Sequence, residues 1–153
     1  MLETIFQYRA LVGKCTLGVG LEWEEIEQIT EIETLFAPAP EEKLRRFRRE
    51  PAAIRALLRG DRIHDNVDVV EVGLGGLVVR NAPYVARGER VELVVEHGDF
   101  SYRFCAQGAW LKDDGDDYRL GLAFVGMPVR LRRAVVAKRA SEPSIVDRIA
   151  LAA

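Results

Sequence analysis

The clearest helical pattern of apolar and polar positions lies in residues 21–36, which read LEWEEIEQITEIETLF. Glutamates occupy much of this segment, and the apolar residues that recur every three or four positions are Ile26, Ile29, Ile32 and Phe36. This spacing places the apolar side chains on one face of a helix. Pro38 and Pro40 follow, and proline cannot continue a helix because it lacks an amide hydrogen. The pattern predicts an amphipathic helix over 21–36 that ends before a linker.

The next segment is dominated by charge. Glu41–Glu50 reads EEKLRRFRRE, with too few apolar residues for a buried element, and Pro51 biases Glu50 toward an extended conformation. We therefore expect a basic linker at 41–51, between a helical extension at 1–40 and the segment that begins at residue 52.

Beyond Pro51 the pattern changes to short runs typical of strands. They read AAIRALL, VDVVEV, GLVVR, RVELVVEH, FSYRFCAQGAWL and YRLGLAFV, and turns rich in Gly and Asp separate them. Residues 96–99 and 112–117 carry the residue types that tight hairpins need. Six strands without intervening helices predict a mainly β fold over 52–128, an antiparallel barrel or sandwich.

The tail at 129–153 returns to a mixed apolar and basic pattern, beginning VRLRRAVVAKRA. We expect a C-terminal helix there that covers a barrel edge or opening, and a second short helix in the last residues.

Length and charge refine this picture. The 153 residues are 48% hydrophobic and 30% charged, which fits a single globular domain with extensions. Residues 1–42 hold nine acidic side chains, whereas residues 43–62 hold eight basic ones. This local basic run favours a confined anion site. A sequence pI near 5.8 disfavours a general nucleic-acid binder, which usually has a broad basic surface.

Candidate catalytic groups are sparse. His64 and His97 are the only histidines, and neither has a nucleophile or a base as a motif partner. Cys15 and Cys105 form no CxxC pair, which indicates neither a disulfide nor a zinc site, and we interpret them as reduced, buried thiols. The chain is therefore predicted to be no enzyme and to use no cofactor and no metal.

Two further loops have simple interpretations. The acidic residues Asp113–Asp117 lack the ligand spacing of a calcium-binding loop and fit a solvated hairpin tip. Residues 73–76 read GLGG, but a strand pattern follows them, whereas the nucleotide-binding loops of ATP and NAD proteins are followed by a helix.

The N-terminus lacks a signal-peptide pattern, and no run of eighteen apolar residues occurs, so we expect a cytoplasmic protein without membrane insertion.

One combination of motifs is more specific. Arg45 and Arg49 form an RxxxR motif in the linker, and Glu71-Val72-Gly73-Leu74-Gly75-Gly76 follows twenty-two residues later on a β pattern. Residues 118–124 read YRLGLAF. The sequence here resembles the PilZ family over roughly 43–127. That family carries RxxxR before a β-barrel, a [D/N]xSxxG motif at a strand turn, and a later strand that ends close to GxxF.

The resemblance implies a six-stranded antiparallel barrel and a bacterial signalling receptor for cyclic di-GMP. Guanidinium groups bind phosphate through two hydrogen bonds and stack on purines, and a turn glycine lets backbone amides approach a ligand. The ligand-binding residues that the resemblance implies are Arg45, Arg46, Arg49, Glu71, Gly73 and Gly76. Ligand binding is expected to change the arrangement of linker and barrel and so to regulate a partner.

An alternative rests on two differences from the family motif. Glu71 stands where the family has Asp or Asn, and Gly73 stands where it has Ser. These differences favour a PilZ-like adaptor that does not bind the nucleotide and acts through protein contacts. Helix 21–36 is the expected surface for a protein partner or for self-association, and the alternative is that it packs against the barrel. The family is associated with motility, pili, surface polysaccharide and development in bacteria.

Overall fold

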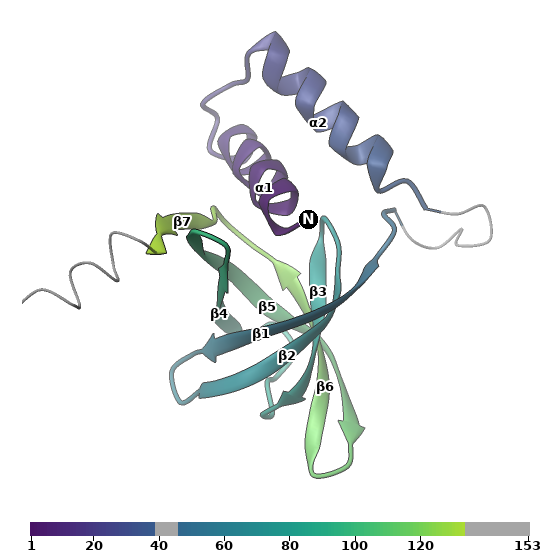
Figure 1. Cartoon of the computed structure of the whole chain (residues 1–153), viewed down its shortest axis with the longest axis vertical. Helices are drawn as coiled ribbons and strands as arrows, with labels where there is room; N and C mark the ends of the chain where they lie inside the picture. Colours follow the sequence, from purple (N-terminus) through teal and green to yellow (C-terminus); the bar gives the residue numbers. More distant parts are fainter. Residues whose placement is uncertain (39–45, 134–153) are drawn as a thin grey trace, which may run out of the picture.

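The computed structural model of the protein describes residues 1–38 and 46–133. Within these ranges two helices, α1 (Leu2–Thr16) and α2 (Trp23–Leu35), precede seven strands (Figure 1). The strands are β1 (Glu50–Arg59), β2 (His64–Val72), β3 (Gly76–Ala82), β4 (Arg90–His97), β5 (Phe100–Asp114), β6 (Asp117–Phe124) and β7 (Val129–Arg132).

The first six strands close into an antiparallel barrel. They follow the order β4-β1-β2-β3-β6-β5, and β4 also pairs with β5, so the sheet has no break between its first and last strands. β7 adds a seventh strand by pairing with residues 100–103 of β5. The predicted mainly β fold, the six-stranded antiparallel barrel and both predicted hairpins are therefore confirmed.

The barrel interior follows from the alternation of side chains along each strand. In β4, for example, Val91, Leu93 and Val95 are buried, whereas the residues between them are partly exposed. The fully buried side chains contributed by the strands include Leu58, Val67, Val79, Leu93, Phe104 and Leu120. The alternation is clearest in β4, whereas β3 and β6 each bury three consecutive residues, 77–79 and 120–122.

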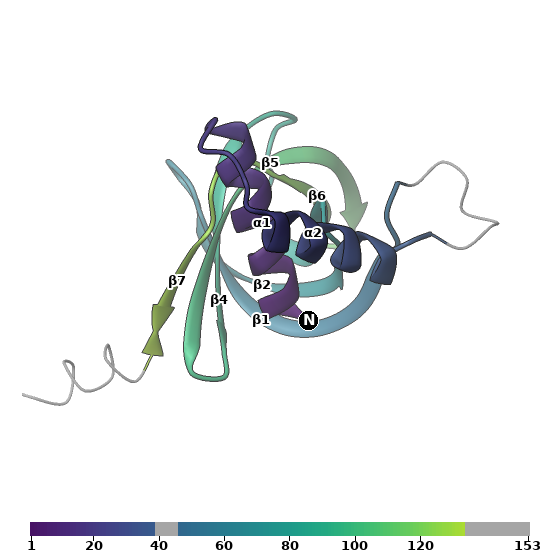
Figure 2. The same ribbon diagram turned by 90° about the horizontal axis from the view of Figure 1, so that it is seen from above.

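Helix α1 covers one opening of the barrel (Figure 2). Its buried residues are Leu2, Ile5, Tyr8, Leu11 and Gly13, and Ile5 has no exposed surface. Leu2, Ile5 and Tyr8 belong to the same apolar cluster as the barrel interior. This helix was not predicted from the sequence, although the buried residues at positions 2, 5, 8 and 11 recur every third position, an interval that fits a helix.

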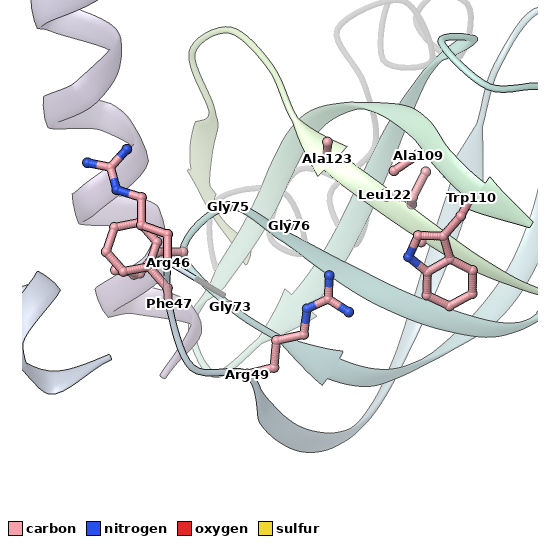
Figure 3. Close-up of a pocket in the computed structure, with 12 residues that line it drawn as sticks. Arg46, Phe47, Arg49, Gly73, Gly75, Gly76, Ala109, Trp110, Leu122 and Ala123 are labelled. Atoms are coloured by element: carbon pink, nitrogen blue, oxygen red, sulfur yellow. The ribbon is translucent and has the colours of Figure 1, made fainter. Parts of the chain in front are cut away.

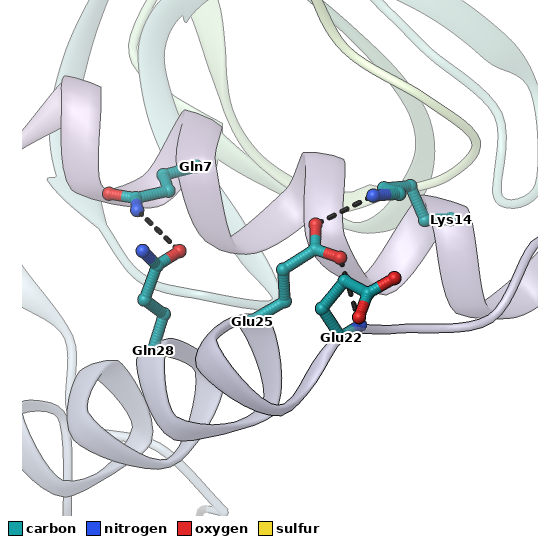
Figure 4. Close-up of polar contacts among 5 residues, drawn as sticks. All are labelled: Gln7, Lys14, Glu22, Glu25 and Gln28. Carbon is teal, nitrogen blue, oxygen red and sulfur yellow. Dashed lines mark hydrogen bonds and ion pairs between the residues drawn. The ribbon is translucent and has the colours of Figure 1, made fainter.

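Helix α2 runs back alongside α1 and forms a hairpin with it. Lys14 Nζ donates a hydrogen bond of 2.6 Å to Glu25, and Gln7 Nε2 donates one of 3.0 Å to Gln28 (Figure 4). The amide of Glu22 donates to the Glu25 carboxylate, which stabilises the first turn of α2. The Lys14 hydrogen bond, followed by that of the Glu22 amide, lowers the pKa of Glu25.

The apolar face of α2 is largely covered by the protein itself. Ile32 and Phe36 are buried in the common core, and Ile29 packs against it. Only the N-terminal end of this face is open, where Trp23 is 77% exposed and Ile26 is 41% exposed. The helix predicted over 21–36 is present as α2, but most of its isoleucine stripe is not available to a partner in this arrangement.

Two sequence interpretations need correction. Residues 129–132, predicted as the start of a helix, form strand β7, because their backbone groups pair with the free part of β5. The rest of the predicted C-terminal helix lies outside the described residues. Cys15 and Cys105, interpreted as buried, are both exposed and unpaired with each other.

Neither helix in the described part of the chain is both long and apolar enough to span a membrane.

The environment of Tyr8 is expected to lower the stability of the fold at alkaline pH. Tyr8 is only 5% exposed, and its hydroxyl donates a hydrogen bond of 2.9 Å to Glu33. Burial, followed by this hydrogen bond, raises the pKa of Tyr8 to about 12. Because the unfolded-state pKa lies near 10, this contribution to stability is complete below pH 10 and is lost as pH rises toward 12.

We therefore expect the difference in unfolding free energy between the wild type and Tyr8→Phe to shrink as pH rises through this range, since phenylalanine cannot ionise. Urea unfolding of both proteins at intervals from pH 8 to 12 measures this difference. Parallel pH curves for the two proteins would contradict the buried, hydrogen-bonded state of the hydroxyl.

Candidate functional site

A pocket of about 330 Å³ opens where the linker passes the turn between β2 and β3 (Figure 3). The linker contributes one wall, the turn at 73–76 forms a second, and β5 and β6 supply the rest. The lining residues are Arg46, Phe47, Arg49, Gly73, Leu74, Gly75, Gly76, Ala109, Trp110, Gly121, Leu122 and Ala123. The volume lies at the lower end of the range found for small-molecule pockets.

The glycine-rich turn is held tightly to the barrel. The Gly73 amide donates to the Gly76 carbonyl at 2.9 Å, and the Phe124 amide donates to the Gly75 carbonyl at 2.9 Å. A Cβ atom at Gly76 would lie 2.1 Å from the Leu122 carbonyl oxygen of the neighbouring strand β6. Glycine is therefore required at residue 76 for the strands to pair, whatever its relation to a ligand.

Trp110 forms an aromatic wall that sequence reasoning did not find. The register between β5 and β6 shifts between Gly108 and Trp110, so Ala109 is an extra residue in a β-bulge. The indole lies directly over Gly121, where a Cβ atom would come within 2.2 Å of its Nε1. Trp110 remains 38% exposed. The bulge and the missing side chain of Gly121 together present a flat aromatic surface at the pocket.

Arg49 faces this aromatic wall. In Figure 3 its guanidinium extends across the pocket toward Trp110. Arg49 Nη1 also lies 3.6 Å from Glu71 Oε2, and each side chain is about one third exposed. An ion pair with this exposure contributes about 1 kcal/mol or less, so an anion with stronger contacts can displace Glu71.

The other linker arginine in the pocket points elsewhere. The Arg46 guanidinium lies 5.0 Å from the centre of the Phe47 ring, and its Nη2 lies 3.8 Å from Glu33 Oε1 in α2. Figure 3 shows this guanidinium directed away from Trp110. Phe47 also contacts Tyr8 of α1 edge to face, with ring centres 6.0 Å apart. The site therefore touches the helical hairpin as well as the barrel.

The structure brings together most of the residues that the sequence singled out. Arg46, Arg49, Gly73 and Gly76 line one pocket, and Glu71 contacts it through Arg49. Arg45 lies outside the described residues. The pocket residues that sequence reasoning missed and that offer large side chains are Phe47 and Trp110. Only Phe47 had a sequence signal, since it sits between the arginines.

A second RxxxR motif, formed by Arg55 and Arg59, lies outside this site. Arg55 and Arg59 are exposed on β1, and they pair with Asp68 of β2 and Glu92 of β4 at 3.3 and 3.6 Å. These contacts place both arginines on the barrel wall, and neither residue lines the pocket.

The remaining candidate groups lie outside the pocket. His64 and His97 are exposed, at the start of β2 and the end of β4. In the acidic hairpin tip, Asp114 pairs with Arg80 at 2.9 Å. No group of three or more His, Cys, Asp or Glu side chains within 1–38 and 46–133 is arranged to hold a metal ion.

Comparison with known proteins gives one family match. The sequence profile described as the PilZ domain matches residues 43–138, which is more than half of the chain. This segment includes the linker arginines, the glycine-rich turn and all six barrel strands. No curated protein matches the chain.

The two neighbouring glycines of the turn provide a matched test of the site geometry. We expect Gly76→Ala to lower the free energy of unfolding by about 2 kcal/mol or more, because the added methyl group would overlap the Leu122 carbonyl. Gly75→Ala serves as the control, since a Cβ atom there meets nothing within 4 Å. Urea unfolding measures both. Equal stability of the two variants would contradict the close approach of β3 and β6.

Proposed function

This chain belongs to the PilZ family of cyclic di-GMP-binding signalling domains, and we propose that it is a non-catalytic, cytoplasmic receptor that binds cyclic di-GMP in the pocket between linker and barrel. The observation that carries the proposal is the position of Arg49 opposite Trp110. A cation and an aromatic surface across one pocket suit a ligand that combines phosphate with a purine base.

The pocket chemistry supports each part of this ligand. The Arg49 guanidinium can form two hydrogen bonds to a phosphate or stack on a guanine face. The Trp110 indole offers a second stacking surface, and stacking of a base on an aromatic side chain contributes about 1–3 kcal/mol. The backbone at 73–76 carries no side chain beyond that of Leu74, so a ligand can approach it closely.

Glu71 has two possible partners in this proposal. It pairs with Arg49 in the structure, and its carboxylate can instead accept hydrogen bonds from the donor edge of guanine. Binding would then replace the ion pair between Arg49 and Glu71 with two contacts to the ligand. Arg49 would bind the phosphate, and Glu71 would bind the base. The linker would change its position relative to the barrel, and this change would regulate a protein partner.

The Arg49–Glu71 ion pair also favours a second candidate function. Glu71 already neutralises the charge of Arg49. In addition, Gly73 provides no hydroxyl where the family has serine. A barrel of this kind can act as an adaptor that binds proteins and not the nucleotide. The open end of the α2 face, with Trp23 and Ile26, is the surface that such an adaptor would offer.

Isothermal titration of cyclic di-GMP distinguishes the two functions. We expect saturable binding by the wild type, and a loss of about ten- to a hundredfold in affinity in Arg49→Ala, because a hydrogen bond to a charged group is removed. Arg59→Ala is the matched control, since it removes the same charge from β1 outside the pocket. Moderate salt screens nonspecific attraction. Equal weakening by both variants, or no binding by the wild type, would contradict the receptor.

Restoring the family residue tests the effect of Gly73. A Cβ atom at this position would have its nearest neighbour, Arg49 Cγ, at 3.5 Å, so serine fits without displacing the backbone. We expect Gly73→Ser to tighten cyclic di-GMP binding by about tenfold through one added hydrogen bond to a charged group. The same titration measures it. An unchanged dissociation constant would show that the hydroxyl makes no contact with the ligand.

A further inference from the structure

The charge of Arg46 is held outside the pocket that its residue lines. Its guanidinium stacks on Phe47 and approaches Glu33 of α2, although 80% of the side chain is exposed. Arg49, three residues along the chain, instead turns its guanidinium across the pocket (Figure 3). The two arginines of the pocket wall therefore differ in direction, and the Arg46 guanidinium lies over the Phe47 ring with its Nη2 3.8 Å from Glu33 Oε1.

The Glu33 carboxylate is held in position by a contact that does not involve Arg46. The Tyr8 hydroxyl donates a hydrogen bond to Glu33 Oε1, the same oxygen that lies closest to Arg46. Tyr8 is itself buried against the barrel core, and the Glu33 side chain is only 34% exposed. The carboxylate is thus held in one place by α1, and only the Arg46 side chain has to move when the contact forms or breaks.

The backbone around Arg46 allows that movement without unfolding. The Arg48 amide donates to the Phe36 carbonyl at 2.7 Å, and Phe47 packs on Tyr8, and these contacts hold the backbone beside the hairpin in this arrangement. Arg46 already lines the pocket, so rotation about its side-chain bonds carries the guanidinium from Glu33 to an anion bound there. Exposed arginine side chains rotate on a nanosecond timescale.

We propose that Glu33 of α2 competes with the bound ligand for Arg46 and so sets the affinity of the pocket. This inference rests on the proposed function, because it takes a nucleotide phosphate as the second partner of Arg46. A negative ligand that recruits Arg46 must first replace Glu33. The contact between Glu33 and Arg46 lowers the affinity for the ligand by some factor. By linkage, the bound ligand weakens that contact by the same factor.

The test compares two glutamates of one helix. Glu33→Gln keeps an oxygen that can accept the Tyr8 hydrogen bond but removes the charge that holds Arg46. Glu31→Gln removes the same charge two residues away, where Glu31 is exposed and makes no ion pair with any described residue. We expect Glu33→Gln to bind cyclic di-GMP about two- to fivefold more tightly than Glu31→Gln, a range typical of a partly exposed ion pair.

A double-mutant cycle tests whether the effect of Glu33 on ligand affinity acts through Arg46. In an Arg46→Ala background the advantage of Glu33→Gln over Glu31→Gln should disappear, because nothing remains to be released. An advantage that persists without Arg46 would overturn the competition in favour of a general charge effect. Thermal unfolding of each variant confirms that the folded state is retained.

Failure of this inference is distinguishable from failure of the receptor. If the wild type binds and Glu33→Gln matches Glu31→Gln, the competition is overturned and the receptor stands. If neither the wild type nor Glu33→Gln binds cyclic di-GMP, both are overturned. Binding that is detected in Glu33→Gln and not in the wild type supports the competition and overturns the receptor.

Discussion

Closure of the barrel opening by α1 is the constraint on which the rest of the structure depends. A six-stranded barrel leaves an apolar interior exposed at its ends unless another element covers them, and Leu2, Ile5 and Tyr8 cover one end from α1. Once α1 lies there, α2 must return alongside it, and the linker must enter β1 past the same opening. The burial of Tyr8 thus places Phe47 and Arg46 beside the glycine-rich turn.

The pocket that results has its positive charges paired within the protein. Arg49 has Glu71 as its partner, and Arg46 has Glu33. Each ion pair is partly exposed and individually weak. The pairs therefore neutralise the charges of both arginines, and a ligand can still displace either carboxylate. A ligand with two phosphates offers both arginines stronger contacts at once, whereas a ligand with one phosphate gains less. This arrangement favours a polyvalent anion with stacking surfaces, which is the chemistry of a cyclic dinucleotide.

The sequence predicted most of the elements whose signal is local, although α1 was missed. Short strand-type runs between turns identified all six barrel strands, and the Gly and Asp residues of 96–99 and 112–117 identified two hairpins. β7 was misread because four residues are too short to distinguish a strand from a helix by periodicity. The wall formed by Trp110 was missed for a different reason. Its orientation depends on the bulge at Ala109 and on the bare backbone of Gly121 in the next strand, and neither is visible in the β5 segment alone.

The central claim is that cyclic di-GMP lies against Trp110 in the pocket, and the two tryptophans of the chain allow a direct measurement. Each indole N–H gives its own signal in a ¹H–¹⁵N NMR spectrum. Trp110 lines the pocket, and Trp23 is exposed at the start of α2. On titration with cyclic di-GMP we predict a saturable shift of the Trp110 signal, while the Trp23 signal stays in place. An unmoved Trp110 signal at saturating nucleotide would contradict the account.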